Sequence, residues 1–163
     1  MKKHELTDDT ITVGGRILHR IKALKSFSDV EEGDLGGYVE KEDNLDHSGE
    51  AWVSGNARVY GDAWVSGDAR VYGNARVYGD ARVSGDARVS GENDYAAAKG
   101  FGREYRTTTF FRLQDGGIGV RCGCFCGTLE EFREKVKETH KESKMGKEYL
   151  MLADLMEYKF KNA

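Results

Sequence analysis

One repeated six-residue unit limits this chain to a narrow set of folds. From Ala51 to Glu92 the sequence is AWVSGN, ARVYGD, AWVSGD, ARVYGN, ARVYGD, ARVSGD and ARVSGE, seven consecutive hexads without a break. Each hexad has Ala first, Val third and Gly fifth, and its sixth residue is Asn, Asp or Glu. The segment Leu45 to Glu50 (LDHSGE) is interpreted as a degenerate eighth copy. A repeat of fixed length predicts an array of stacked units.

The positions within the hexad predict a very short strand followed by a sharp corner. Ala and Val are two residues apart, so in a strand both point inward, while the second and fourth residues (Arg or Trp, Tyr or Ser) point outward. Gly followed by Asn or Asp is typical of a corner, because both tolerate positive φ. We therefore predict a mainly β chain built on a short left-handed β-helix. Three hexads would form one coil of 18 residues, and about three coils would make a stack about 14 Å tall.

The composition of 21 Gly and no Pro agrees with this prediction. Glycine is needed at the corners, and a coil whose backbone N–H groups pair with the next coil has few places for proline. The chain is expected to have three parts, namely a hairpin and capping segment at 1–38, the β-helix at 39–92 and a small α+β subdomain at 93–163. The outer parts are expected to cover the ends of the stack, since exposed strand edges invite aggregation.

Both flanks contain recognisable local signals. Gly14-Gly15 separates two alternating segments, Thr10–Val13 and Arg16–Ala23, and this predicts an N-terminal hairpin. Gly36-Gly37 is interpreted as another turn. After the repeats, the expected elements are a helical turn near the start of 93–102, strands at 105–113 and 118–126, and helices at 128–141 and 147–160, the first opened by a Thr128/Glu131 capping box. A hairpin backed by two helices is therefore expected at the C-terminal end.

Charge and cysteine content exclude several classes of protein. The 25 Lys and Arg nearly balance the 28 Asp and Glu, so the net charge is −3 and nucleic acid is not an expected partner. No apolar run approaches the length of about 18–20 residues that a membrane helix needs, and no signal peptide is evident. The odd number of three Cys argues against a secreted disulfide framework. We expect a cytoplasmic protein with reduced thiols and no membrane association.

The outward hexad positions form the predicted binding surface. Its residues are Trp52, Arg58, Tyr60, Trp64, Arg70, Tyr72, Arg76, Tyr78, Arg82 and Arg88. Residues 18 apart are expected to stack, so that Arg58 meets Arg76, Tyr60 meets Tyr78, Trp64 meets Arg82, and Trp52 meets Arg70 and then Arg88. Aromatic residues with Arg are typical of interface hot spots, which favours self-association or a protein partner. Cation–π ladders that only stabilise the solenoid, and stacking of nucleic-acid bases, are the alternatives.

The three cysteines are predicted to be structural. In one continuous strand, Cys122, Cys124 and Cys126 would share a face with neighbouring sulfurs about 6.5–7 Å apart. Metal ligands must lie about 2.3 Å from a shared ion, which a flat strand does not provide. We therefore predict small buried apolar residues, and neither a metal nor a cofactor. A metal site, with His140 as a distant fourth ligand, and a redox site are the alternatives.

Two segments resemble a known family. GDLGGYVEKEDNL, at 33–45, running into AWVSGNARVYGDA, resembles the β-solenoid repeat proteins that are common in phages and prophages and also occur in bacterial genomes. The segment at 108–140 is similar to a tail found on many phage-type members. The resemblance implies a phage or prophage origin, and it supplies no catalytic residues.

The leading functional hypothesis is a non-enzymatic, phage-encoded protein-binding or assembly module. It would act through the solenoid faces and the C-terminal subdomain, as a homo-oligomer or on a host protein such as a defence factor. The repeat also resembles that of hexapeptide acyltransferases, which implies an alternative in which His47 is catalytic, although the short unbroken solenoid argues against it. Nucleic-acid binding, or mimicry by the acidic residues between Glu31 and Asp43, is a further alternative.

Overall fold

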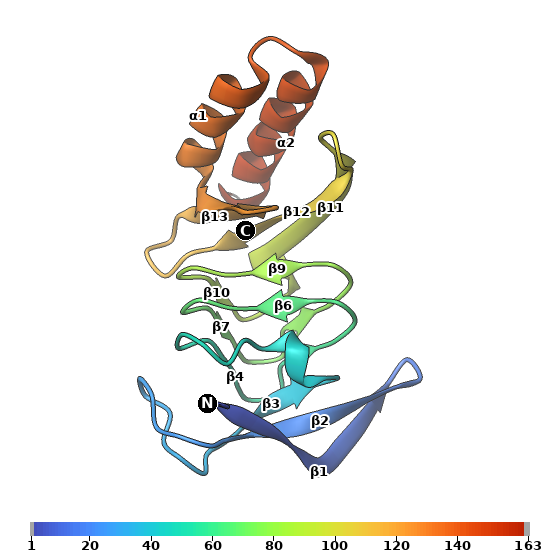
Figure 1. Cartoon of the computed structure of the whole chain (residues 1–163), viewed down its shortest axis with the longest axis vertical. Helices are drawn as coiled ribbons and strands as arrows, with labels where there is room; N and C mark the ends of the chain where they lie inside the picture. Colours follow the sequence, from blue (N-terminus) through green and yellow to red (C-terminus); the bar gives the residue numbers. More distant parts are fainter. Residues whose placement is uncertain (1, 162–163) are drawn as a thin grey trace.

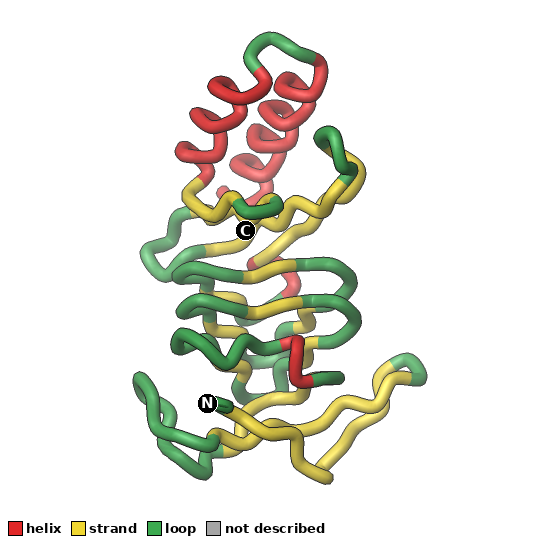
Figure 2. The backbone as a smooth tube through the Cα atoms, in the orientation of Figure 1, coloured by secondary structure: helices red, strands yellow, loops and turns green. Residues whose placement is uncertain are grey.

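The structure, a computed structural model that describes residues 2–161, is a column of stacked coils with a different cap at each end (Figures 1 and 2). The column is built from seven strands of two residues: β4 (Trp52–Val53), β5 (Arg58–Val59), β6 (Trp64–Val65), β7 (Arg70–Val71), β8 (Arg76–Val77), β9 (Arg82–Val83) and β10 (Arg88–Val89). Parallel pairing joins strands 18 residues apart and gives three faces, β4–β7–β10, β5–β8 and β6–β9. The predicted 18-residue stacking is confirmed.

The interior of the column contains the residues that the hexad predicts. Every Ala and Val in first and third place of the seven hexads is buried, with at most 1% of its surface exposed. Six of the seven hexad glycines, Gly55 to Gly85, have φ between 61° and 69°, which is the conformation that the corner requires. The repeated Gly is therefore needed for the backbone turn, and the repeated Ala and Val fill the core.

Hydrogen bonds give the column a direction. The N–H of each coil donates to a carbonyl of the following coil, as in Trp52 to Ala69 (3.1 Å), Arg58 to Ala75 (2.9 Å) and Trp64 to Ala81 (3.0 Å). The carbonyl groups of the first coil therefore have no preceding coil whose N–H groups could donate to them. The N–H groups of the last coil have no following coil whose carbonyls could accept. Buried backbone groups without a partner are costly, so each end needs a cap of the opposite hydrogen-bonding type.

Two side chains supply donors at the N-terminal end of the column. The ammonium of Lys3, a fully buried residue, donates to the carbonyl of Ala51 at 2.6 Å. Burial lowers the pKa of Lys3 from 10.5 to about 8, so the group is still mainly charged at neutral pH. On a second face, the buried Asn44 amide donates to the carbonyls of Gly61 (3.2 Å) and Ala63 (2.8 Å).

The third face is closed by a strand. The N-terminal sheet contains β1 (His4–Val13), β2 (Arg16–Ala23) and β3 (Leu35–Val39), and β3 pairs in parallel with β5. Gly14-Gly15 joins β1 to β2, as predicted. The prediction of a turn at Gly36-Gly37 is wrong, because both residues lie within β3. Glycine is required there for close approach: a Cβ at Gly36 would lie 2.5 Å from the carbonyl oxygen of Val53.

The C-terminal cap supplies acceptors. A short 3-10 helix (Glu92–Asp94) leads into a sheet of β11 (Tyr95–Phe101), β12 (Arg106–Arg112), β13 (Ile118–Cys122) and β14 (Phe125–Thr128), and α1 (Leu129–His140) and α2 (Lys144–Lys161) cover the sheet face turned away from the column (Figure 1). The Thr109 hydroxyl accepts the N–H of Arg82 at 2.9 Å, and the Asp94 carboxylate accepts that of Ser90 at 2.8 Å. The cap therefore places acceptor oxygens against the end of the column where backbone N–H groups need partners.

The helical turn predicted near the start of 93–102 is present as the 3-10 helix, but the strand that follows it was not predicted, and two other predictions for this cap need correction. Residues 95–101 form a strand, although their run of alanines has little intrinsic preference for β structure; Ala96 and Ala98 pack against the helix-covered core. The predicted strand at 118–126 is two strands, because Gly123 (φ +59°) turns the chain. The last helix begins at Lys144 and not at Lys147, so that Gly146 lies inside it. A Cβ at Gly146 would lie 2.9 Å from the carbonyl oxygen of Lys141.

Removing the Lys3 ammonium is expected to destabilise the whole column. In Lys3→Met, the apolar part of the side chain is kept, but the Ala51 carbonyl loses its buried donor. We expect a loss of about 1–3 kcal/mol in the free energy of unfolding, measured by urea denaturation. The neighbouring Lys2→Met removes only an exposed ion pair with Glu42 and should stay within about 0.5 kcal/mol of the wild type. Equal stability of the two variants would contradict this function of Lys3.

Candidate functional site

The ten predicted surface residues lie on all three faces of the column and do not form one surface. Trp52, Arg70 and Arg88 belong to the β4–β7–β10 face, Arg58 and Arg76 to the β5–β8 face, and Trp64 and Arg82 to the β6–β9 face, whereas Tyr60, Tyr72 and Tyr78 stand beside the corners. The three faces differ in how much of this set remains exposed.

The β4–β7–β10 face is largely covered. Trp52 is only 3% exposed, and its ring makes an edge contact with Phe27 at 5.4 Å between centroids. Arg70 forms a 2.8 Å ion pair with Asp29, in the same loop as Phe27. The prediction of Trp52 as a binding residue is therefore wrong, because the loop between β2 and β3 folds over this face and makes the indole part of the core.

The corner after β5 and β8 carries the predicted tyrosine stack. The rings of Tyr60 and Tyr78 are 5.3 Å apart and nearly parallel, at 9°. Beside them, Arg58 and Arg76 occupy paired positions of β5 and β8. Tyr78 is 47% exposed, so this ladder is accessible. Stacked aromatic rings add favourable contacts between coils, which is the structural alternative for this ladder.

The β6–β9 face has a different arrangement, because the C-terminal cap adds a residue to it. The half-buried Trp64 ring lies 5.8 Å from the guanidinium carbon of Arg82 and 5.3 Å from that of Arg121. Arg82 is one coil away in β9, as predicted, whereas Arg121 comes from β13. Neither guanidinium forms an ion pair with any residue in the range 2–161. The indole is thus in contact with two cations that lack anionic partners within the described chain.

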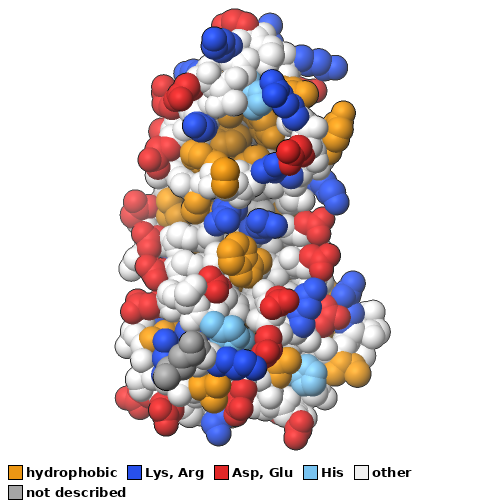
Figure 3. Space-filling view, in the orientation of Figure 1, with side chains coloured by type: hydrophobic (Ala, Val, Ile, Leu, Met, Phe, Trp, Pro, Cys, Tyr) orange, Lys and Arg blue, Asp and Glu red, His pale blue; other side chains and the backbone are white. Residues whose placement is uncertain are grey.

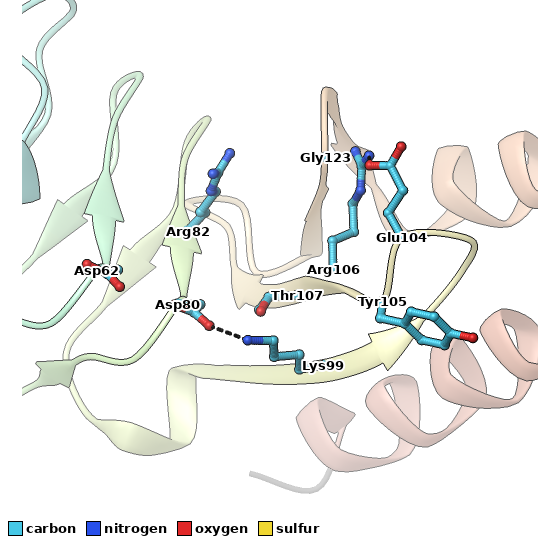
Figure 4. Close-up of a pocket in the computed structure, with 9 residues that line it drawn as sticks. All are labelled: Asp62, Asp80, Arg82, Lys99, Glu104, Tyr105, Arg106, Thr107 and Gly123. Carbon is cyan, nitrogen blue, oxygen red and sulfur yellow. Dashed lines mark hydrogen bonds and ion pairs between the residues drawn. The ribbon is translucent and has the colours of Figure 1, made fainter.

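Two hollows adjoin Arg82, and one of them is also lined by the indole of Trp64. One, of about 390 Å³, lies where the column meets the C-terminal sheet and is lined by residues that include Arg82, Lys99, Arg106 and Thr107 (Figure 4). The other, of about 370 Å³, lies toward the N-terminal end and is lined by Trp64 and by residues that include Asp43, Asp46 and His47. Asp62 and Arg82 line both hollows, so the two form one continuous uneven surface.

Charge changes sign along this surface. In Figure 3, an apolar side chain lies midway along the column, with Lys or Arg side chains directly above it and Asp, Glu and His side chains below. We call this surface the Trp64 face and define it by Asp43, Asp46, Asp62, Trp64, Arg82 and Arg121. Sequence reasoning had singled out Trp64 and Arg82. It missed Arg121, because nothing in the sequence gives the position of β13 relative to the repeats.

His47, the candidate of the acyltransferase alternative, has a structural function here. Its Nδ1 accepts the backbone N–H of Lys3 at 3.0 Å, and its ring stacks on that of His4 with 4.2 Å between centroids. His4 is fully buried, and neither of its ring nitrogens has a hydrogen-bond partner. Burial, with the neighbouring His47, lowers the pKa of His4 from 6.5 to about 4. The pair closes the contact between β1 and the first coil.

The cysteines do not share a face. Cys122 is half-buried and accepts the Thr108 hydroxyl at 3.3 Å; Cys124 is exposed at the turn; Cys126, also exposed, has its sulfur 3.2 Å from the Ser84 hydroxyl oxygen. The prediction of three buried apolar residues is wrong for Cys124 and Cys126, because the turn at Gly123 directs the thiols apart. Within residues 2–161, no group of three or more His, Cys, Asp or Glu is arranged to hold a metal ion.

His140 lies near Cys122 but not as a ligand. Both line a hollow of about 330 Å³ beside α1, where the His140 ring is 5.6 Å from that of Tyr149. The Tyr149 hydroxyl oxygen lies 3.8 Å from the Cys122 sulfur, and burial together with this thiol raises the pKa of Tyr149 above its usual range. The phenol therefore remains protonated at neutral pH and serves as a weak hydrogen-bond partner of the thiol.

The two tryptophans are expected to differ in their contribution to stability. Trp52→Ala empties a core position and should cost about 3–5 kcal/mol of unfolding free energy. Trp64→Ala removes a half-exposed ring and should cost less than about 2 kcal/mol, although both residues occupy the second position of a hexad. Urea denaturation of the two variants measures the difference. A larger loss for Trp64→Ala would mean that the Trp64 face is part of the core.

His4 is expected to make stability sensitive to acid. The unfolded chain takes up a proton on His4 near pH 6.5, whereas the folded chain does so only near pH 4. The free energy of unfolding should therefore fall as the pH drops through this range. In His4→Phe the buried ring is kept without unpaired nitrogens, so the fall should be shallower than in the wild type. Denaturation curves at pH 7, 5.5 and 4 compare the two, and parallel pH profiles would contradict the burial of a neutral His4.

Comparison with known proteins supports the β-solenoid and is limited to the repeats. The model of the YdcK beta solenoid repeat matches residues 51–67 and 69–83. No curated protein matches the chain. In the part of the chain that the structure describes, neither α1 nor α2 is long and apolar enough to cross a membrane. The matched residues belong to the column, which is therefore similar to a known class of β-solenoid repeat.

Proposed function

We propose that this chain is a non-enzymatic protein-binding or assembly module that uses the Trp64 face. The observation that carries the proposal is the contact of one half-buried indole with two guanidinium groups, those of Arg82 and Arg121, which have no carboxylate partner among residues 2–161. Tryptophan and arginine are the residues most enriched in interface hot spots. A planar guanidinium also pairs well with a carboxylate from a partner protein.

The surroundings of Trp64 favour binding over a purely structural function. Two other arginines pair within the chain: Arg70 of β7 with Asp29 and Arg112 of β12 with Asp94, at 2.8 and 2.9 Å. The first pair fastens the loop between β2 and β3 to the column, and the second joins two elements of the C-terminal cap. Arg82 and Arg121 form no ion pair within the described chain, and two hollows that a partner's side chains can enter adjoin Arg82.

The resemblance to phage and prophage β-solenoid proteins supports a more specific form of the proposal. In this form the module is phage-encoded, acts in the host cytoplasm, and binds either another copy of itself or a host factor such as a defence protein. The 18-residue pairing register and the three faces support a left-handed β-helix of about three coils as its architecture.

Capture with matched baits tests the proposal. The wild type, the double variant Trp64→Ala/Arg82→Ala, and the control Tyr78→Ala/Arg76→Ala on another face are used to capture proteins from cells that express the chain. We expect a protein that the wild type and the control retain and the double variant loses, because the indole and its cation provide most of the binding energy. Mass spectrometry identifies the captured proteins. Equal capture by all three baits would contradict the proposal.

A further inference from the structure

The residues of the Trp64 face follow one another along the column in a fixed order. The bridge between Leu45 and Val65 places Asp46 one strand toward the N-terminal end, next to β6. Arg82 pairs with Trp64 one strand toward the C-terminal end, and Arg121 follows from the cap. Because neighbouring strands are about 4.8 Å apart, acid, indole and base succeed one another within about 10 Å.

The two ends of this face carry charges that the chain leaves unbalanced. At the N-terminal end, Glu42 pairs with Lys2 and Asp62 with Lys41, both at 3.0 Å. The exposed Asp43 and the half-buried Asp46 form no ion pair with any residue from 2 to 161, although Asp46 raises the pKa of the nearby Lys3.

The opposite end has the opposite excess. Lys99 pairs with Asp80 at 3.1 Å, as Figure 4 shows, and Arg106 pairs with Glu104. Arg82 and Arg121 have no such partner within the described residues. Two unpaired carboxylates thus lie on one side of Trp64 and two unpaired guanidiniums on the other.

This order is self-complementary under a two-fold rotation. A two-fold axis that lies in the interface, parallel to the face and perpendicular to the column, and that passes over Trp64 exchanges the two ends. Asp43 and Asp46 of one copy then approach Arg82 and Arg121 of the other, and the two indoles meet at the axis. Closed dimers use self-complementary patches of this kind, whereas a parallel arrangement would place like charges together.

We propose that the occupant of the Trp64 face is a second copy of this chain, bound antiparallel about a two-fold axis near Trp64. The inference rests on the proposed function of this face and names its partner. Each end of the interface joins two carboxylates to two guanidiniums, and the hollows on either side of Arg82 admit the partner's side chains. Because these charges lie at a rim that water reaches, the dimer weakens as the salt concentration rises.

Charge-exchange variants of the full chain test the pairing. Asp43→Arg places a cation opposite Arg82 of the second copy, and Arg82→Glu places a carboxylate opposite Asp43 of the second copy. Each variant alone should dimerise at least about tenfold more weakly than the wild type, because like charges meet. An equimolar mixture should form the mixed dimer, in which Arg at position 43 meets Glu at position 82 and Arg82 meets Asp43. Native mass spectrometry distinguishes the three dimers by mass.

A control separates this pairing from a general effect of charge. Arg76→Glu reverses an exposed arginine at the same hexad position on the β5–β8 face, and it should dimerise like the wild type. Circular dichroism of each variant verifies that the fold is retained, and sedimentation velocity at about 100 µM gives the fraction of dimer. A monomeric wild type, or dimers that neither reversal weakens, would overturn the inference.

The result also separates this inference from the proposed function. A monomeric wild type that still captures another protein through Trp64 would overturn the self-association and leave the binding function in place. Failure of capture by every bait, together with a monomeric wild type, would overturn both.

Discussion

The structure depends on completing the backbone hydrogen bonds at the two ends of a short stack. Each inner coil both donates to and accepts from its neighbours, but the first coil presents carbonyls and the last presents N–H groups. In a column this short, the end coils are a large share of the whole, so the caps are as important to stability as the repeat. The chain matches each cap to its end: an ammonium, an amide and a strand at the carbonyl end, and a hydroxyl and a carboxylate at the amide end.

The caps also assemble the candidate site. The N-terminal cap turns through a 3-10 helix (Glu42–Asn44), and the same turn that directs the Asn44 amide to the column leaves Asp43 exposed beside Trp64. The C-terminal sheet that provides the Thr109 hydroxyl also places Arg121 against the indole. The Trp64 face is therefore made by three separate parts of the chain: Asp43 and Asp46 come from the N-terminal side, Asp62, Trp64 and Arg82 from the column, and Arg121 from the C-terminal cap.

The hexads were sufficient to predict the column, its inner residues and the stacking of Trp64 with Arg82, because a repeated local pattern imposes the same geometry in every coil. They could not distinguish Trp52 from Trp64, which have the same neighbours in sequence. Trp52 is buried by the loop between β2 and β3, which comes from another part of the chain. Trp64 gains a second cation, Arg121, from a strand of the C-terminal cap. Lys3, Asn44 and Thr109 were likewise hidden, since a single polar residue carries no periodic signal and its function depends on where tertiary folding places it.

Backbone hydrogen exchange tests the dependence on capped ends most directly. If the Thr109 hydroxyl and the Asp94 carboxylate replace the missing coil, the amides of Arg82 and Ser90 at the end of the column should exchange within about tenfold of the rate of the Trp64 amide, which donates to the following coil. Exchange at the terminal positions that is faster by several orders of magnitude, with Trp64 protected, would show that the last coil is open. It would contradict the claim that the caps complete the stack.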